Sequence, residues 1–461
     1  MVKRLSLIGG PFLALLVGGA LNGAGALNSS AAWVAGVTIL CAFWWVTEPI
    51  PIPATSIIPF ALLPLGGVLT HKEVAHAYGD TLILLLMGGF ILSTAMESSG
   101  AHRRLALGMV KWLGGRGGRR IVFGFMTASA LMSMWISNTA TVLMLLPVTM
   151  AVLEQSEDRG MDAPLLLGIA YAANVGGIGT PIGTPPNVVM MGVFAETTGQ
   201  SISFPEWMLF GVPVVILMVP SMWLWLTRHL EREGRPLVFP PVGRWTAAEV
   251  RVVAVFALTA LAWMTRRAPF GGWSALLGVP EAGDSTVALT ASLALFVLPD
   301  GRGGRLLTWE KASRIPWGLL LLFGGGIALA KAFKVSGLSE VLGAQLADLI
   351  HMPVFLLIFL VCLVVTFLTE VTSNTATTAL LMPILAASAL TADMDPRLLM
   401  IPAAAGASCA FMLPVATAPN AIVFGAERFS LKTMALHGLV INFVGAGVIS
   451  ICAFLYLHWV G

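Results

Sequence analysis

A polar pentapeptide, Ser-Asn-Thr-Ala-Thr, occurs twice in this chain, at residues 137–141 and 373–377, and each copy interrupts a long apolar stretch. Inside a bilayer, sequence that leaves the helix is tolerated only where protein or a water-filled cavity satisfies its polar backbone. A single copy would fit side chains that bond back to their own helix. Two copies, 236 residues apart and each followed by a proline at the same distance (Pro147 and Pro383), indicate one binding site assembled from two repeats.

The composition is that of a polytopic membrane protein. Of the 461 residues, 57% are hydrophobic and 11% are charged, whereas soluble domains carry roughly 25% charged residues. Apolar runs of about 17–25 residues can cross the hydrocarbon core as helices, and they predict an all-α protein with about eleven transmembrane helices plus two re-entrant hairpins. The expected spans are residues 5–21, 31–47, 52–68, 80–97, 164–196, 206–228, 247–264, 283–299, 316–334, 397–428 and 433–457.

The N-terminal segment, residues 1–30, has the basic flank and apolar run of a secretory signal peptide. Because ten further spans follow, we expect it to remain as an uncleaved transmembrane helix. Lys3 and Arg4 place the N-terminus in the cytoplasm under the positive-inside rule. Alternating the spans from there puts 20 Lys and Arg residues inside and 6 outside, although Arg266 and Arg267 run against the rule. The sequence therefore predicts a multi-pass protein of the cell inner membrane.

Other function classes find little support in the sequence. An intramembrane enzyme needs a buried Ser/Lys or Asp/Asp arrangement or a His-rich metal cluster, and the seven histidines are scattered. A channel would show a charged ring or a filter-like repeat, and a nucleic-acid partner is not indicated. The cysteines lie in apolar segments without paired spacing, which predicts small core residues and neither disulfides nor a metal site: Cys41, Cys362, Cys409 and Cys452.

The duplication extends beyond the pentapeptide. Residues 84–100 resemble residues 319–337 with the same offset of 236, and residues 179–192 resemble residues 412–425 with an offset of 233. The latter pair contains GTPPN and ATAPN, whose prolines interrupt helices and leave free backbone groups. A proline kink that only tunes helix packing would explain one such break, but both breaks share a flanking Asn and Gly.

These similarities divide the chain into two repeats, residues 31–228 and 247–457, joined by a cytoplasmic linker at 229–246. Each repeat holds five crossings, so the second must be inverted relative to the first, as in many secondary transporters. Each also holds one hairpin (121–153 or 353–390), and the two hairpin tips are expected to meet near the midplane. The broken helices that complete the site are predicted at residues 164–196 and 397–428.

The tips can hold both a cation and an anion. Hydroxyl, amide and carbonyl oxygens can replace the hydration shell of Na⁺, while Asn NH₂ groups, Thr hydroxyls and helix N-termini can donate to a carboxylate. Neither tip nor broken stretch contains Lys, Arg or His. Because an unpaired buried charge is very costly, bound Na⁺ ions are expected to compensate a dianion.

Three residues beside the tips extend the candidate site. Ser133 and Thr369 each lie four residues before a motif serine, on the same helical face, and are candidate ion ligands. Glu370 lies three residues before Ser373, and Met134 occupies the matching position in the first repeat. Two interpretations of Glu370 stay open: a role in coupling or protonation, or a place at the mouth of the hairpin where it bonds backbone donors.

At this point the chain resembles the divalent anion/sodium symporter family, which carries succinate, malate, fumarate, citrate or sulfate. The resemblance spans nearly the whole chain and rests on both Ser-Asn-Thr motifs and on residues 407–416 followed by Asn420. It implies a homodimer and an elevator-like movement of the hairpin-bearing domain. It implies an anion site at Asn138, Thr139, Thr184, Pro185, Asn374, Thr375 and Thr417, one sodium at Ser133, Ser137, Asn138 and Gly183, and a second at Thr369, Ser373, Asn374 and Ala416.

One departure from the family pattern concerns substrate choice. The second broken helix has Ala418 where many relatives have the first proline of a pair, so this wall of the site is smaller and less rigid. Asn and Thr donors suit a C4 dicarboxylate, a tricarboxylate carried as a dianion, or sulfate, in that order. A sodium-independent dicarboxylate exchanger is the alternative, but it should replace the ion ligands with cationic side chains.

Overall fold

The structure is a computed structural model. It describes residues 2–23, 25, 27–113, 117–156, 159–230, 243–267, 271–345 and 352–460. Most of the predicted linker, residues 231–242, lies outside this described part of the chain. Within it, the elements are helices joined by turns, with one isolated β-bridge between Pro299 and Arg305. The predicted all-α class is therefore confirmed.

Eight of the described helices are long and apolar enough to cross a membrane. They span Lys3–Gly23, Ser29–Thr47, His71–Ser99, Phe204–Leu226, Ala247–Met264, Trp317–Ser336, Asn374–Thr391 and Leu431–His458. Shorter apolar helices lie at Ile52–Leu65, Asp284–Val297, Val354–Thr369 and Arg397–Ala407. This content is that of a multi-pass membrane protein. The helix at Asn374–Thr391 reaches spanning length although the sequence predicts it as a hairpin arm.

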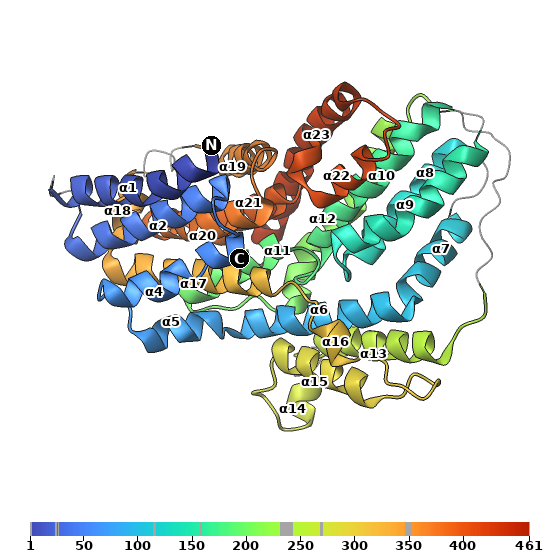
Figure 1. Cartoon of the computed structure of the whole chain (residues 1–461), viewed down its shortest axis with the longest axis horizontal. Coiled ribbons are helices and arrows are strands. Elements are labelled where there is room, and N and C mark those ends of the chain that lie inside the picture. Colours follow the sequence, from blue (N-terminus) through green and yellow to red (C-terminus); the bar gives the residue numbers. More distant parts are fainter. Residues whose placement is uncertain are drawn as a thin grey trace.

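The helices form two large groups (Figure 1). One group, drawn nearly horizontal, contains α1 (Val2–Gly23), α2 (Ser29–Thr47), α4 (Ile58–Leu65), α5 (His71–Tyr78) and α17 (Trp317–Ser336). The other, drawn obliquely, contains α8 (Gly118–Ser133), α9 (Asn138–Gln155), α10 (Asp162–Gly176), α12 (Phe204–Leu226) and α23 (Leu431–Val460). Helix α6 (Thr81–Ser99) runs beneath both, above α13 (Ala247–Met264), α14 (Gly272–Leu276), α15 (Asp284–Val297) and α16 (Trp309–Ala312).

Each pentapeptide starts a helix. Helix α8 ends at Ser133 and α9 begins at Asn138, with the Ser137 hydroxyl accepting the Ala140 N–H at 3.2 Å. Serine is a favoured N-cap because its side-chain oxygen satisfies a backbone donor of the first turn. In the second half, α19 (Val354–Thr369) and α20 (Asn374–Thr391) are separated in the same way, and Ser373 accepts the Ala376 N–H at 3.4 Å.

Two further interruptions lie at the proline-containing stretches. After α10 the chain forms a short 3₁₀ turn at Gly177–Gly179 and resumes as α11 (Pro185–Thr198). After α21 (Arg397–Ala407) the chain forms a 3₁₀ turn at Pro414–Ala416 and resumes as α22 (Ala418–Phe424). Elsewhere in this half, α18 (Leu338–Gln345) packs near α20. Proline suits the first helical turn because the N–H that it lacks would have no partner there.

One predicted span differs from the structure. Residues 52–68, expected as a single crossing, form two short helices, α3 (Ile52–Thr55) and α4, with a turn between them. Prolines near the starts of both helices remove the N–H groups that would continue a single hydrogen-bond ladder through this region. The four cysteines are buried and unpaired, as expected of small core residues.

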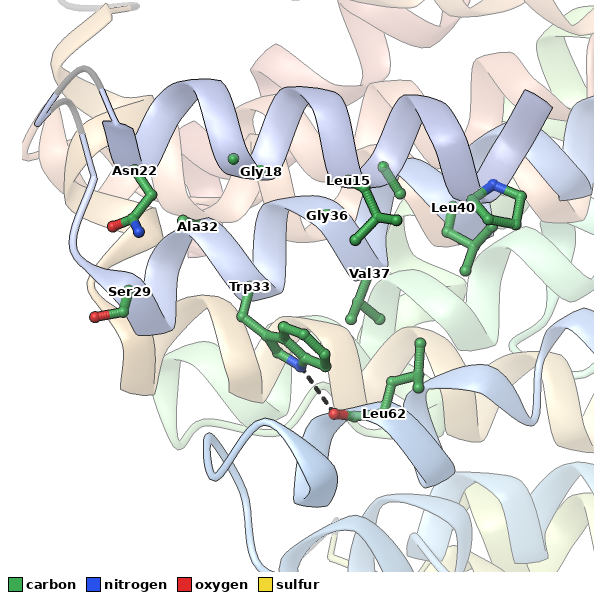
Figure 2. A pocket seen from close by; sticks show the side chains of 13 residues that line it. Leu15, Gly18, Asn22, Ser29, Ala32, Trp33, Gly36, Val37, Leu40 and Leu62 are labelled. Carbon is green, nitrogen blue, oxygen red and sulfur yellow. Dashed lines mark hydrogen bonds between the residues drawn. The ribbon is translucent and has the colours of Figure 1, made fainter. Parts of the chain in front are cut away.

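An apolar groove of about 500 Å³ lies between α1, α2 and α4 (Figure 2). The backbones of α1 and α2 approach closely, since a Cβ on Gly36 would lie 3.2 Å from the Ala14 carbonyl oxygen. Trp33 crosses toward α4 and its Nε1–H donates to the Leu62 carbonyl at 2.8 Å. Asn22 and Ser29 are the polar residues of this lining, which contains no charged side chain, so the groove has the character of lipid-facing surface.

Candidate functional site

A second cavity, of about 610 Å³, lies where the two tips and the two breaks meet. Its size is typical of sites for small ligands, roughly 300–1,000 Å³. Its lining contains the predicted site residues Ser137, Asn138, Thr139, Gly183, Thr184, Pro185, Ser373, Asn374, Thr375, Ala416 and Thr417. Ser133 and Thr369 do not line it and are fully buried. Residues more than 230 positions apart in the chain are thus brought into one space.

Helix N-termini converge on this cavity. Helices α9, α20 and α11 begin with residues of its lining. The first turn of a helix leaves N–H groups without intrahelical partners and carries partial positive charge, which favours an anion. Pro185 and Pro186 remove two of these donors from α11. The free backbone donors therefore come mainly from the starts of α9 and α20, at the two motif copies.

The first predicted ion cluster is gathered around Asn138. The Ser133 hydroxyl donates to Asn138 Oδ1 at 2.5 Å. A Cβ on Gly177 would lie 2.9 Å from Asn138 Oδ1 and 3.1 Å from the Gly183 carbonyl oxygen. Both oxygens therefore pack closely against Gly177, where a side chain would clash with them. Neutral oxygens of this kind are the ligands that hard cations prefer, so the donor set fits Na⁺.

The second predicted ion cluster is arranged differently. The Thr369 hydroxyl donates to two carbonyls of its own helix, Val365 at 3.1 Å and Thr366 at 3.0 Å. Asn374 Oδ1 is buried and has no hydrogen-bond partner among the described residues. A buried acceptor without a partner costs about 1–3 kcal/mol. Asn374 therefore offers an oxygen that a bound cation would satisfy, and the donor set fits Na⁺ here as well.

Asn174 is a residue of the cavity that the sequence analysis missed. It lies on α10, is 2% exposed, and accepts a long hydrogen bond of 3.5 Å from Asn138 Nδ2. Its own Nδ2 donates to Thr417 Oγ1 at 3.1 Å and to Asn420 Oδ1 at 3.4 Å. The sequence feature that could have pointed to Asn174 is a single amide side chain within the apolar part of α10. Comparing the repeats could not find it, because Ala407 occupies the matching position in the second half.

Two charged side chains also line the cavity, Glu97 on α6 and Arg314 in the segment before α17. Arg314 is exposed to solvent. The tips themselves are neutral, as their sequence requires. Lys331 and Lys334 on α17 do not line the cavity. The Lys331 ammonium pairs with Glu73 at 3.8 Å, and the Lys334 ammonium donates to the Thr197 carbonyl at 3.2 Å.

A matched pair of asparagines holds the two breaks. Asn187 Nδ2 donates to the carbonyls of Gly177 and Thr180 at 2.9 and 2.8 Å. In the second half, Asn420 Nδ2 donates to the carbonyls of Ala410 and Leu413 at 2.9 and 3.1 Å. The asparagine and the two carbonyl residues that it binds are each related to their counterparts by the offset of 233 seen in the sequence. Both extended turns are therefore closed by the same hydrogen bonds.

Glu370 is 4% exposed and bonds backbone donors, which was one of its two interpretations. Its carboxylate accepts the N–H groups of Phe411, Met412 and Leu413 at 2.7, 2.9 and 3.0 Å. These residues form the extended turn after α21. Glu370 thus connects the second hairpin to the second broken helix.

Comparison with known proteins identifies a transporter family. A family model described as citrate transporter (CitMHS) matches residues 42–399. The chain belongs to this family. A sodium-dependent dicarboxylate transporter, SdcS, from Staphylococcus saprophyticus is 39% identical over 447 residues, covering 92% of this chain and 85% of the relative. Its namesake from Staphylococcus aureus (strain bovine RF122) is 39% identical over 441 residues, covering 90% of this chain and 84% of the relative.

A solved structure shares the fold. The YdaH transporter of Alcanivorax borkumensis, whose crystal structure is described as having an unusual topology, matches with a TM-score of 0.62 at 13% identity. The match covers 84% of this chain and 87% of that one. At this identity the likeness concerns the fold alone. It agrees with a polytopic helical membrane protein.

Proposed function

We propose that this protein is a secondary transporter that takes up dicarboxylates such as succinate, malate or fumarate together with Na⁺. The observation that carries the proposal is the convergence of neutral oxygen acceptors and helix N-termini on one cavity, with Asn374 Oδ1 left without a partner in the described part of the chain. Relatives at 39% identity that are named sodium-dependent dicarboxylate transporters support it.

The anion binds between the two tips. Its carboxylates accept hydrogen bonds from Asn amides, Thr hydroxyls and the first-turn N–H groups of α9 and α20. The residues proposed for the anion are Asn138, Thr139, Thr184, Pro185, Asn374, Thr375 and Thr417. The polar side chains among them lack fixed charge, so the anion needs another source of positive charge.

Sodium ions supply that charge. The first ion binds at Ser133, Ser137, Asn138 and the Gly183 carbonyl, and the second at Thr369, Ser373, Asn374 and the Ala416 carbonyl. Each asparagine can give Oδ1 to the ion and Nδ2 to the anion, because an amide carries both an acceptor and donors. Two Na⁺ neutralise a dianion, and a third would allow the membrane potential to drive uptake.

Uptake into proteoliposomes tests this function. Labelled succinate uptake should rise steeply with external Na⁺ and should not be supported by K⁺. Competition by unlabelled citrate and sulfate then ranks the alternative anions, since the matching family model is described as a citrate transporter. Equal uptake in Na⁺ and K⁺, with counterflow that needs neither, would favour a sodium-independent exchanger.

The membrane arrangement is also a proposal: two inverted repeats, an N-terminus in the cytoplasm, a place in the cell inner membrane, a homodimer, and an elevator-like movement of the hairpin-bearing part. Thiol labelling tests the orientation, since the native cysteines are buried. With a membrane-impermeant reagent on intact cells, Glu281→Cys should label and Arg302→Cys should not. Both positions are exposed and lie on opposite predicted sides. Cross-linking of the purified protein tests the dimer.

A further inference from the structure

The second broken helix is held by one buried carboxylate. Glu370 Oε1 accepts hydrogen bonds from the Phe411 and Met412 N–H groups and from Asn442 Nδ2, at 2.7, 2.9 and 2.8 Å. Its Oε2 accepts the Leu413 N–H at 3.0 Å. Hydrogen bonds to an ionised acceptor are about twice as strong as neutral ones. Four donors from α23 and the extended turn thus meet on this single side chain.

This contact continues to the predicted second ion site. Leu413 donates its N–H to Glu370, and its carbonyl accepts the Ala416 N–H at 3.2 Å and a hydrogen bond from Asn420 Nδ2 at 3.1 Å. Ala416 is the residue whose carbonyl is proposed as a ligand. Hydrogen bonds therefore connect Glu370 to Leu413 and Leu413 to Ala416, while Glu370 is not itself among the proposed ion ligands.

In the first half, the hairpin and the extended turn are connected by uncharged groups. Met134 replaces Glu370, and its main-chain carbonyl accepts a hydrogen bond from the Thr180 hydroxyl. The Thr180 carbonyl then accepts the Gly183 N–H at 3.3 Å, as Leu413 does from Ala416. The connection between hairpin tip, extended turn and ligand residue is thus present in both halves, through a hydroxyl in one and a carboxylate in the other.

We propose that Glu370 is a positioning residue for the second sodium site: it holds the 411–413 turn against the hairpin and thereby fixes the Ala416 carbonyl. The inference rests on the sodium-coupled function proposed above. Residues that orient metal ligands typically change metal affinity by about 10–100-fold when mutated. Glutamine in place of Glu370 would keep one acceptor oxygen and turn an NH₂ group toward N–H donors, which loosens the turn.

The test is a sodium titration of Glu370→Gln, by succinate uptake and by the sodium-dependent change in Tm without succinate. The sodium concentration at half-effect should rise at least about tenfold, while the KM for succinate at saturating sodium changes far less. Glu249→Gln is the matched control, because Glu249 is a buried carboxylate (6% exposed) that binds Arg104 Nε at 2.9 Å and the Thr246 N–H at 2.7 Å away from the cavity. It should lower Tm and leave the sodium midpoint unchanged.

Asn442→Ala provides a second variant if Glu370→Gln does not fold. It removes one donor, keeps the carboxylate, and should shift the sodium midpoint in the same direction by a smaller factor. An unchanged midpoint in the folded variant, or a shift equal to that of Glu249→Gln, overturns the inference. Wild-type protein in the same assay separates the two proposals, because loss of sodium dependence there would refute the function itself.

Discussion

The two halves of the cavity have the same arrangement of hairpin tip and broken helix, but they differ in how many hydrogen-bond partners the protein gives to the asparagine of the tip. Around Asn138, Ser133 and Asn174 already satisfy the side-chain amide. Around Asn374, the matching oxygen has no partner among the described residues. Polar side chains thus complete much of the first site, whereas the second leaves an acceptor for a ligand. The difference suggests that ligand binding stabilises the second half more than the first.

The difference at Oδ1 comes from Ser133, whose counterpart Thr369 donates to its own helix, and Asn174 adds a second difference at the Asn138 Nδ2 group. It reaches from Asn138 in the first half to Thr417 and Asn420 in the second. Because Ala407 occupies the matching position in the other half, it offers no side-chain amide for the equivalent link from Asn374 to Thr184 and Asn187. A residue that differs between the two repeats, Asn174, therefore connects the tip of the first hairpin to the second broken helix through hydrogen bonds.

The largest expected effect comes from replacing either asparagine of the tips. Asn138→Ala and Asn374→Ala should each abolish succinate uptake, because each removes a proposed ion ligand and a proposed anion donor. Asn138→Ala should also lower stability by about 1–3 kcal/mol, since Ser133 and Asn174 lose their partner. Asn374→Ala should cost less. Uptake assays together with Tm in detergent measure both effects, and normal uptake by either variant would remove that residue from the site.

The next effect is linkage between ion and anion. If Na⁺ supplies the charge, each ligand must raise the affinity for the other by the same factor, because coupling free energy is reciprocal. We expect a factor of about ten or more, measured by calorimetry or thermal shift. Ser133→Ala should weaken the sodium response more than Thr369→Ala, since Ser133 also supports Asn138.

Succinate binding that is equally tight without sodium would contradict this linkage. The positive charge would then have to come from a side chain, and Arg314 is the cation in the described lining of the cavity. Arg314→Gln would separate the cases: it should abolish binding in an exchanger and leave the sodium linkage intact in a symporter.

A moderate and nearly equal effect is expected where the halves agree. Asn187→Ala and Asn420→Ala each leave two buried carbonyls without their amide donor, which should cost about 1–3 kcal/mol. Asn420→Ala should cost slightly more, because Asn174 also donates to it. Thermal unfolding in detergent measures the difference, and a large effect in only one half would show that the matched hydrogen bonds do not carry matched energies.

The smallest effect is expected in the apolar groove. Trp33→Phe removes the hydrogen bond to the Leu62 carbonyl, worth about 1 kcal/mol, in a groove that shares no lining residue with the cavity. It should lower Tm slightly and leave the sodium dependence of uptake unchanged. A shifted sodium midpoint would show that this groove is coupled to the cavity.

Much of the cavity was accessible to prediction because its residues occur in pairs. Ser137 and Ser373 lie at the predicted hairpin tips, where they cap helices, and both are in the lining of the cavity. Asn174 was not accessible in this way, since Ala407 occupies the matching position and a comparison of the repeats would not reveal it. The segment expected as a single crossing at 52–68 contains two helices, α3 and α4, because hydropathy averages over prolines that interrupt the helix.

The sequence by itself determined the membrane class, the helical content, the family and the two polar tips, because these depend on composition, local hydrogen-bonding capacity and internal similarity. The tertiary structure decided which oxygens share a space and which remain unpartnered. Gly177 is adjacent to Asn138 Oδ1, and Glu370 meets the 411–413 turn, only through contacts between segments distant in the chain. Such contacts depend on helix packing, and no local pattern of residues specifies which donor reaches which acceptor.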